Sequence, residues 1–279
     1  MFLDSLDIIK SSLDVITKMY NVVHAKGNVD HNVVNANNFR EEIVRQNLIT
    51  YCNNDCIGLI EALVKYRDSI FDEYGIDIWG KKMVYSTASL AMKIYKTNYY
   101  KKTYHLHIPT TEFNDYAKCA YKGGSNQIFY RGIFKNRRVR SIDYNSMYPY
   151  CMTGLFPIGP YFKQNFGMLY TGQQSLYHGV YKVIVLETPD LETYFLCDKI
   201  NGMLVAAKFT NYQLHITQEE LLYAHKLGYK MYIIDAVISK NMGYIFKDFV
   251  EDLYEKRKQV KKEMKKHAEG SSDYNVLDG

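Results

Sequence analysis

The chain has 279 residues, of which 47% are hydrophobic, and its formal net charge is +5. A hydrophobic share of this size supports a folded core and excludes a chain that is disordered throughout, and no apolar run is long enough to cross a bilayer. The mild positive charge suits a phosphate-rich partner but does not by itself establish one.

The first part of the chain is predicted to be mainly helical. Apolar residues that recur at helical spacing predict helices over about 9–20, 41–73 and 86–95. The polar stretch 21–40 is predicted to be a loop, and a mixed connector follows the third helix up to about Cys119.

The second part mixes strands with helices. Thr217 and Glu220 form a capping-box pattern that predicts a helix from about 218, which Gly228 ends. A lysine-rich last helix is predicted to start near Tyr244. The predicted strands are Gln127–Phe134, Arg138–Asp143, Tyr181–Glu187 and Tyr229–Ser239. These elements together predict an α+β (mixed) fold class.

The five cysteines are scattered and odd in number, which argues against a disulfide framework and for a reducing compartment. Cys52 and Cys56 share a helix face, and a metal pair is one interpretation of them. Because no further His or Cys pair lies nearby to complete four ligands, small core thiols are the better interpretation.

The segment SIDYNSMYP, residues 141–149, carries the strongest chemical signal. The strand predicted before it delivers Asp143 at its end, and the chain then turns through Asn145 and Ser146. A carboxylate at a strand end can bind a hard cation, and the turn presents backbone groups to a phosphate. By composition alone, an ordinary turn after an edge strand is the better interpretation of the segment.

The motif DYNSMYP resembles the first palm motif of family B DNA polymerases, and the whole chain is most similar to the protein-primed type of phages and linear mitochondrial plasmids. This resemblance implies two-metal phosphoryl transfer with Mg²⁺. It implies that Asp143 binds both metal ions and that the carbonyl of Tyr144 binds one of them. It further implies that Ser146 and Met147 contact the incoming triphosphate, and that Tyr148 lies under the sugar and excludes a 2′-hydroxyl.

The segment YKGG, which begins at Tyr121, resembles the Tyr-x-Gly-Gly element that joins the exonuclease and polymerase domains of this family. Glycines allow close approach of backbone to phosphate, and a lysine adds positive charge. The resemblance implies that Tyr121, Lys122, Gly123 and Gly124 bind DNA. Without the family order, a plain hairpin would be the better interpretation.

Three upstream segments resemble the exonuclease part of the family. Tyr51 and Asp55 lie at i and i+4 on one helix face, as in the third exonuclease motif, which implies that Asp55 binds a metal and Tyr51 orients the attacking water. Lys26 matches a Lys-x-x-hydrophobe element, which implies a position near the scissile phosphate. Ser5 and Leu6 match a Ser-Leu pair that contacts single-stranded DNA. An ordinary pair at a helix start would also explain Tyr51 and Asp55.

The order of these segments implies two family domains. Residues 1–118 would be the C-terminal part of an RNase H-like 3′–5′ exonuclease domain. Residues 119–279 would be the N-terminal part of a palm with inserted elements, truncated before the nucleotide-binding helix. The first exonuclease carboxylates and the Tyr-x-Asp-Thr-Asp hairpin of the family are missing. Because two-metal chemistry needs at least two convergent carboxylates, we expect the chain to be a fragment, a split-gene product or a decaying copy, and to be inactive alone.

The resemblance implies a DNA template-primer and deoxynucleoside triphosphates as partners, a terminal priming protein as a further partner, and no membrane. It favours a mitochondrial location, with a viral or cytoplasmic one as the alternative. A second hypothesis is a non-catalytic nucleic-acid-binding remnant, in which basic residues bind phosphate without turnover. These would be the last helix with Lys135, Arg137, Arg138 and Arg140. A solvated polar face explains that helix as well. An unrelated metal-dependent nuclease would need a carboxylate cluster that the sequence lacks.

Overall fold

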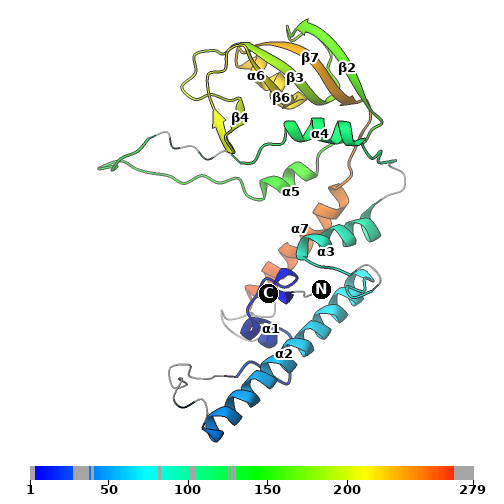
Figure 1. Cartoon of the computed structure of the whole chain (residues 1–279), viewed down its shortest axis with the longest axis vertical. Coiled ribbons are helices and arrows are strands. Elements are labelled where there is room, and N and C mark those ends of the chain that lie inside the picture. Colours follow the sequence, from blue (N-terminus) through cyan, green and yellow to red (C-terminus); the bar gives the residue numbers. More distant parts are fainter. Residues whose placement is uncertain are drawn as a thin grey trace. The chain divides into compact units, whose positions relative to one another are not determined.

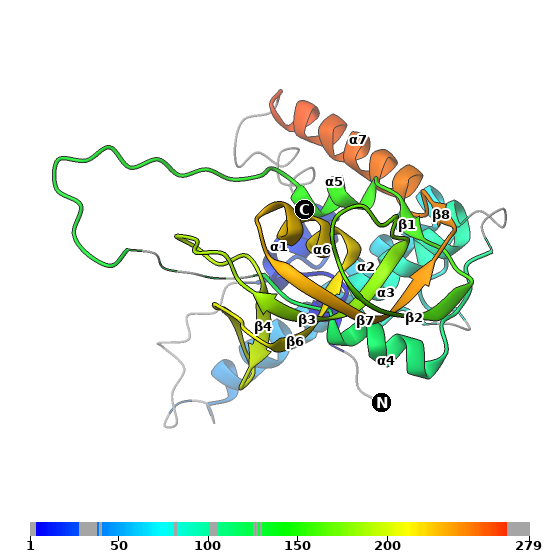
Figure 2. The same cartoon turned by 90° about the horizontal axis from the view of Figure 1, so that it is seen from above.

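The computed structural model describes residues 4–27, 38, 41–80, 83–100, 105–124, 126, 128 and 130–266. The chain divides into two compact units. Residues 1–100 and 248–279 form the first, called here the helical unit, and residues 101–247 form the second, called the sheet unit (Figures 1 and 2). The mixture of helices and strands confirms the predicted α+β class. The division into exonuclease and palm parts at residues 118 and 119 stays a prediction.

The helical unit is built on one long helix. Its elements are the 3-10 turn η1 (Ser5–Asp7), α1 (Leu13–Met19), α2 (Glu42–Tyr74), α3 (Thr87–Ile94), the π-helical turn η2 (Tyr95–Tyr99) and α7 (Lys247–Met264). The predicted long and third helices are confirmed. The predicted helix over 9–20 is shorter, because Ser12 accepts a hydrogen bond from the amide of Val15 and so caps the helix there. The last helix starts three residues later than predicted.

Two clusters hold the helical unit together. Ile16 of α1 packs on Ala62 of α2 in one apolar cluster. In the other, the ring of Tyr99 packs edge-on against Phe249 of α7, and the Tyr99 hydroxyl donates to the carboxylate of Asp252. Burial, with help from that hydrogen bond, raises the pKa of Tyr99 to about 12. Phe249 of α7 is thus part of the packing of this unit.

The sheet unit is centred on a four-stranded antiparallel sheet of order β2-β7-β3-β6. Its helices are α4 (Thr111–Cys119), α5 (Met147–Met152) and α6 (Gln218–Lys226). Its strands are β1 (Phe156–Pro157), β2 (Tyr161–Leu169), β3 (His178–Glu187), β4 (Cys197–Ile200), β5 (Met203–Ala206), β6 (Tyr212–Thr217), β7 (Lys230–Ser239) and β8 (Met242–Gly243). The predicted strands at 181–187 and 229–239 are therefore confirmed as β3 and β7.

One face of this sheet makes the core. Val183 of β3 and Leu214 of β6 are buried against Leu221 of α6. The predicted capping box opens α6: the Thr217 hydroxyl accepts from the Glu220 amide, and the Glu220 carboxylate accepts from the Thr217 amide. This local signal specified the start of the helix.

The opposite face of the sheet carries polar side chains under α4. A β-bulge at Ile234 changes the register, so that Ile233 pairs with Val183 whereas Asp235 pairs with Lys182. Because side chains alternate along a strand, the extra residue lets Ile233 enter the core and turns Asp235 to the α4 side. There the Tyr116 hydroxyl donates to Asp235 Oδ1 at 2.5 Å.

Replacing Tyr116 by Phe should destabilise the sheet unit by about 1 to 2 kcal/mol, because the half-buried Asp235 carboxylate loses its donor. Burial raises the pKa of Tyr116, and Asp235 adds to that effect. The free energy of unfolding from denaturant titration measures the loss. Tyr223→Phe, which removes a hydroxyl from an exposed ring of α6, is the matched control and should change little. Equal values for the two variants would contradict this account of α4.

Two predicted strands are wrong. Residues 126, 128 and 130–143 lie in no strand; Gln127 and Phe129 lie outside the described residues. A strand exists only where a neighbour takes its backbone hydrogen bonds, and none of the described strands pairs with this stretch. Asp143 therefore does not stand at the end of a strand, contrary to the prediction.

Residues 130–145, called here the arm, leave the body of the sheet unit and return to it at α5 (green in Figures 1 and 2). Every residue of the arm is exposed. α4 and α5 are short, and the sequence did not predict either of them. Among the described residues, no helix combines the length and the apolar character needed to span a bilayer.

Candidate functional site

The arm presents charge and aromatic surface side by side. Asp143 lies near its end and is exposed, as is Tyr144. Exposed basic side chains precede them: Arg131, Lys135, Arg137, Arg138 and Arg140. Basic groups bind phosphates and exposed rings stack on bases, so this composition suits a nucleic acid.

The rest of the motif turns into a short helix. Ser146 adopts a left-handed conformation with φ 54°, uncommon for a residue with a side chain. Its carbonyl accepts from the amide of Tyr150 at 3.0 Å, which closes the first turn of α5. Pro149 fits in this turn because no helical partner is needed for its missing N–H. Met147 and Tyr148 in the same turn are exposed to solvent.

The Tyr121–Gly124 segment follows α4 directly. The Lys122 ammonium lies 3.2 Å from Glu220 Oε1, and only 10% of the Lys122 side chain is exposed. The ring of Tyr121 lies 5.5 Å from the ammonium of Lys199 in β4. A Cβ added at Gly123 or Gly124 would meet nothing within 4 Å, and neither glycine has a positive φ. Neither packing nor backbone conformation therefore requires glycine here, which leaves room for a ligand.

Gly123→Ala and Gly124→Ala should leave the unfolding midpoint unchanged or slightly raised, since alanine reduces the freedom of the unfolded chain. Each should weaken DNA binding, because a Cβ occupies the space that a backbone phosphate would approach. Gly179→Ala is the contrast: its Cβ would lie 2.2 Å from the Val237 carbonyl oxygen, and we expect a loss on the order of 3 kcal/mol. Unchanged DNA affinity in both segment variants would contradict a DNA contact at these glycines.

The segment that contains Lys26 packs on α2, the helix that carries Tyr51 and Asp55. A Cβ at Gly27 would lie 3.3 Å from the ring of Tyr51, so the segment beside Lys26 packs on that ring. Its approach depends on Gly58, where a Cβ would lie 2.0 Å from the His24 carbonyl oxygen. A side-chain hydrogen bond with Asp55 raises the pKa of Tyr51.

Asp55 carries an unsatisfied acceptor. Its Oδ1 is buried and has no hydrogen-bond partner among the described residues. A buried carboxylate oxygen without a donor fits a metal ligand, because a cation would supply the missing charge. The described residues nevertheless contain no group of three or more His, Cys, Asp or Glu side chains that could hold a metal. Asp55 and Asp143 therefore belong to no such group within the described part of the chain, and their role as metal ligands stays a prediction.

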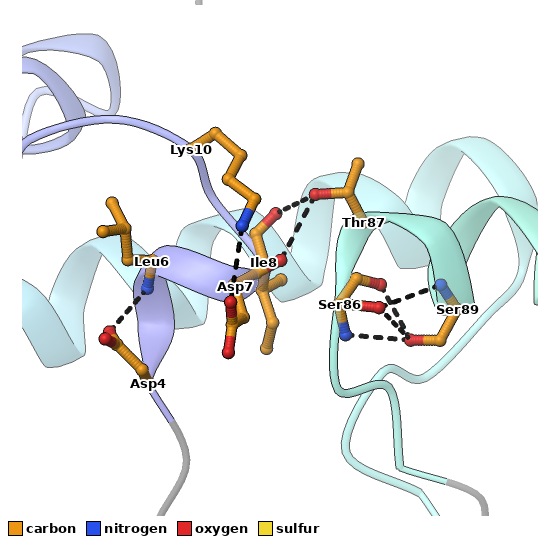
Figure 3. Close-up of polar contacts among 8 residues, drawn as sticks. All are labelled: Asp4, Leu6, Asp7, Ile8, Lys10, Ser86, Thr87 and Ser89. Atoms are coloured by element: carbon orange, nitrogen blue, oxygen red, sulfur yellow. Dashed lines mark hydrogen bonds and ion pairs between the residues drawn. The ribbon is translucent and has the colours of Figure 1, made fainter. Parts of the chain in front are cut away.

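Ser5 and Leu6 belong to the turn η1, and Thr87 at the start of α3 forms a hydrogen bond to the backbone just after this turn (Figure 3). Asp4 caps the turn by accepting from the Leu6 amide at 2.9 Å. The Thr87 hydroxyl donates to the Ile8 carbonyl at 3.0 Å. About half of the Leu6 side chain stays exposed, so the turn presents an apolar group to solvent on a fixed backbone.

Several polar partners could not be found in the sequence. His24 donates its amide to Glu61, and this hydrogen bond is the main cause of the lowered pKa of the Glu61 carboxyl.

The sequence indicated Glu220 only as a helix cap. Cys52 and Cys56 are exposed, so the interpretation as core thiols is wrong. For α4, the signal was Thr110, whose hydroxyl accepts from the Phe113 amide.

The comparisons with known proteins agree on one family. Residues 36–269 match the family described as DNA polymerase type B, organellar and viral. Probable DNA polymerases of Ascobolus immersus and Neurospora intermedia are 26% and 28% identical, over 74% and 79% of this chain. A DNA polymerase of an Acidianus bottle-shaped virus is 32% identical over 55% of it. The chain spans only 17% to 24% of the length of these three relatives.

The fold agrees with the family. A structure of Phi29 DNA polymerase with primer-template DNA and incoming nucleotide matches 98% of this chain with a TM-score of 0.56 and 18% identity. A second crystal form of that polymerase gives a TM-score of 0.55 and 16% identity. The chain covers 46% of each. At this identity the likeness supports the fold alone.

Proposed function

The chain belongs to the organellar and viral type B DNA polymerases, and we propose that it supplies part of the machinery for template-directed DNA synthesis in a larger polymerase. The observation that carries the proposal is the match of residues 36–269, which includes the DYNSMYP motif at the end of the arm and the start of α5. The substrates would be a DNA template-primer and deoxynucleoside triphosphates.

In this proposal the arm and α5 form the polymerase part of the site. Asp143 supplies one metal-binding carboxylate and Tyr144 a carbonyl oxygen. Ser146 and Met147 lie along the triphosphate, and Tyr148 offers its ring to the sugar. Mg²⁺, when bound, would stabilise the charge of the transferred phosphoryl group. The chain's own part is to present these groups on a surface that a nucleic acid can reach.

The helical unit would contribute the exonuclease part. Asp55 would hold a metal, Tyr51 would orient a water, and Lys26 would lie near the scissile phosphate. Ser5 and Leu6 would contact single-stranded DNA. The buried, unpartnered Oδ1 of Asp55 supports this assignment. Priming by a terminal protein, and a mitochondrial location with a viral or cytoplasmic alternative, belong to the same proposal; the relatives come from fungi and a virus.

The purified 279-residue chain should bind a primer-template at low salt but should not extend or degrade the primer. The reason is the number of ligands: each reaction needs convergent carboxylates, and the described residues hold no such group. Gel-based extension with Mg²⁺ and four nucleotides measures the first, and fluorescence anisotropy measures binding. Absence of DNA binding at low salt would contradict the proposal. Extension that is lost on Asp143→Ala would instead contradict the incompleteness.

The alternative is a nucleic-acid-binding remnant that has no polymerase around it. The lack of a convergent carboxylate group among the described residues favours it. Replacing Asp143 in a longer polymerase that contains this chain separates the two hypotheses. DNA synthesis is lost if the chain is part of the polymerase site, and it is unchanged if the chain is a remnant.

A further inference from the structure

An ion pair joins the Tyr121–Gly124 segment to the first turn of α6. Lys122 and Glu220 are separated by 98 residues in sequence, and their side chains are 10% and 28% exposed. A cation so well covered offers little surface to a phosphate while it stays with its acid partner, and breaking such a pair leaves an uncompensated charge.

The geometry of Glu220 makes this contact specific. Its Oε2 accepts from the Thr217 amide at 2.8 Å as part of the capping box, which fixes the orientation of the carboxylate. Its Oε1 is then directed to Lys122. A glutamine can serve in a capping box as well as a glutamate. Glu220→Gln therefore keeps the cap of α6 and removes the charge that holds Lys122.

We infer that Lys122 is a positioning residue, which fixes the Gly123–Gly124 backbone against the sheet unit, and that it is not itself a phosphate contact. Tyr121 and Lys122 are tied to β4 and α6, whereas the two glycines after them have open space. The contacts of Tyr121 and Lys122 thus fix the position of Gly123 and Gly124. The inference rests on the proposed function, since the segment it positions is the proposed DNA contact.

The test measures DNA affinity of the full chain between 50 and 200 mM salt, roughly the range over which phosphate contacts are resolved. If Lys122 positions the segment, Lys122→Met and Glu220→Gln each weaken binding by a similar factor, roughly threefold to tenfold. The double variant is no weaker than either single one, and the salt dependence keeps its slope. Arg138→Met, on the exposed arm, is the control and lowers the slope by about 0.9.

Three results would overturn or redirect the inference. If Lys122 contacts phosphate, Lys122→Met lowers the slope by about 0.9, and Glu220→Gln tightens binding because a competing acid is gone. If Lys122→Met does not fold, the effect of Glu220→Gln on DNA affinity decides alone. Weaker binding supports the positioning role, and tighter binding rejects it. If the unaltered chain binds no DNA, the proposed function fails. The pair is then judged by unfolding midpoints, where additive effects of the two substitutions would reject it.

Discussion

Asp143→Ala in a polymerase that carries this chain should lower the rate of template-dependent nucleotide addition by a factor on the order of a thousand or more. The carboxylate would be a ligand of the metal ions that stabilise charge on the transferred phosphoryl group, and alanine offers no oxygen in its place. Primer extension under single-turnover conditions measures the rate of the chemical step.

The exposed position of Asp143 separates an effect on catalysis from an effect on folding. Because the side chain is in solvent on the arm, its removal should leave the unfolding midpoint unchanged. Asp143→Asn should be as inactive as the alanine variant, since the charge is lost although the shape is kept. Asp190→Ala removes a carboxylate that is 94% exposed and should keep full activity. A loss of less than tenfold in Asp143→Ala would reject the metal-binding role.

Local signals in the sequence were sufficient where an element is specified by its own residues. The capping box of Thr217 and Glu220 predicted α6, and the β-branched run of residues 181–187 predicted β3. The arm has similar strand-forming residues, but no described strand pairs with it, and a strand cannot be specified by one partner. The bulge at Ile234 was equally out of reach, because it depends on pairing with β3.

The candidate site was predictable to the same extent. The motif DYNSMYP identified the arm and α5 by type of residue, while its backbone became a turn and a helix rather than a strand end. A Cβ added at Gly27 would lie 3.3 Å from the ring of Tyr51, so the segment beside Lys26 passes close to that ring. The roles predicted for Lys26, Tyr51 and Asp55 stay predictions. The pairing of Lys122 with Glu220 joins residues 98 positions apart, and nothing in either neighbourhood indicates the other.

DNA binding by the isolated chain should fall steeply with salt, and the arm should account for much of that dependence. The slope of log affinity against log salt is negative, and each phosphate contact that is lost reduces its magnitude by about 0.9 on duplex DNA. Replacing both Arg138 and Arg140 by Gln should therefore lower the slope by about 1.8. Anisotropy titrations with a labelled primer-template at several salt concentrations measure this slope.

A matched control separates the arm from net charge. Lys10→Gln with Lys18→Gln also removes two positive charges, but these lysines pair with Asp7 and Asp14 on the helical unit. If only overall charge matters, the two double variants weaken binding equally. If the arm contacts phosphates, only the arginine variant loses slope, because only its charges release counterions from DNA. Equal slopes in both variants would reject the arm as the DNA-binding surface, whatever the affinity of the chain.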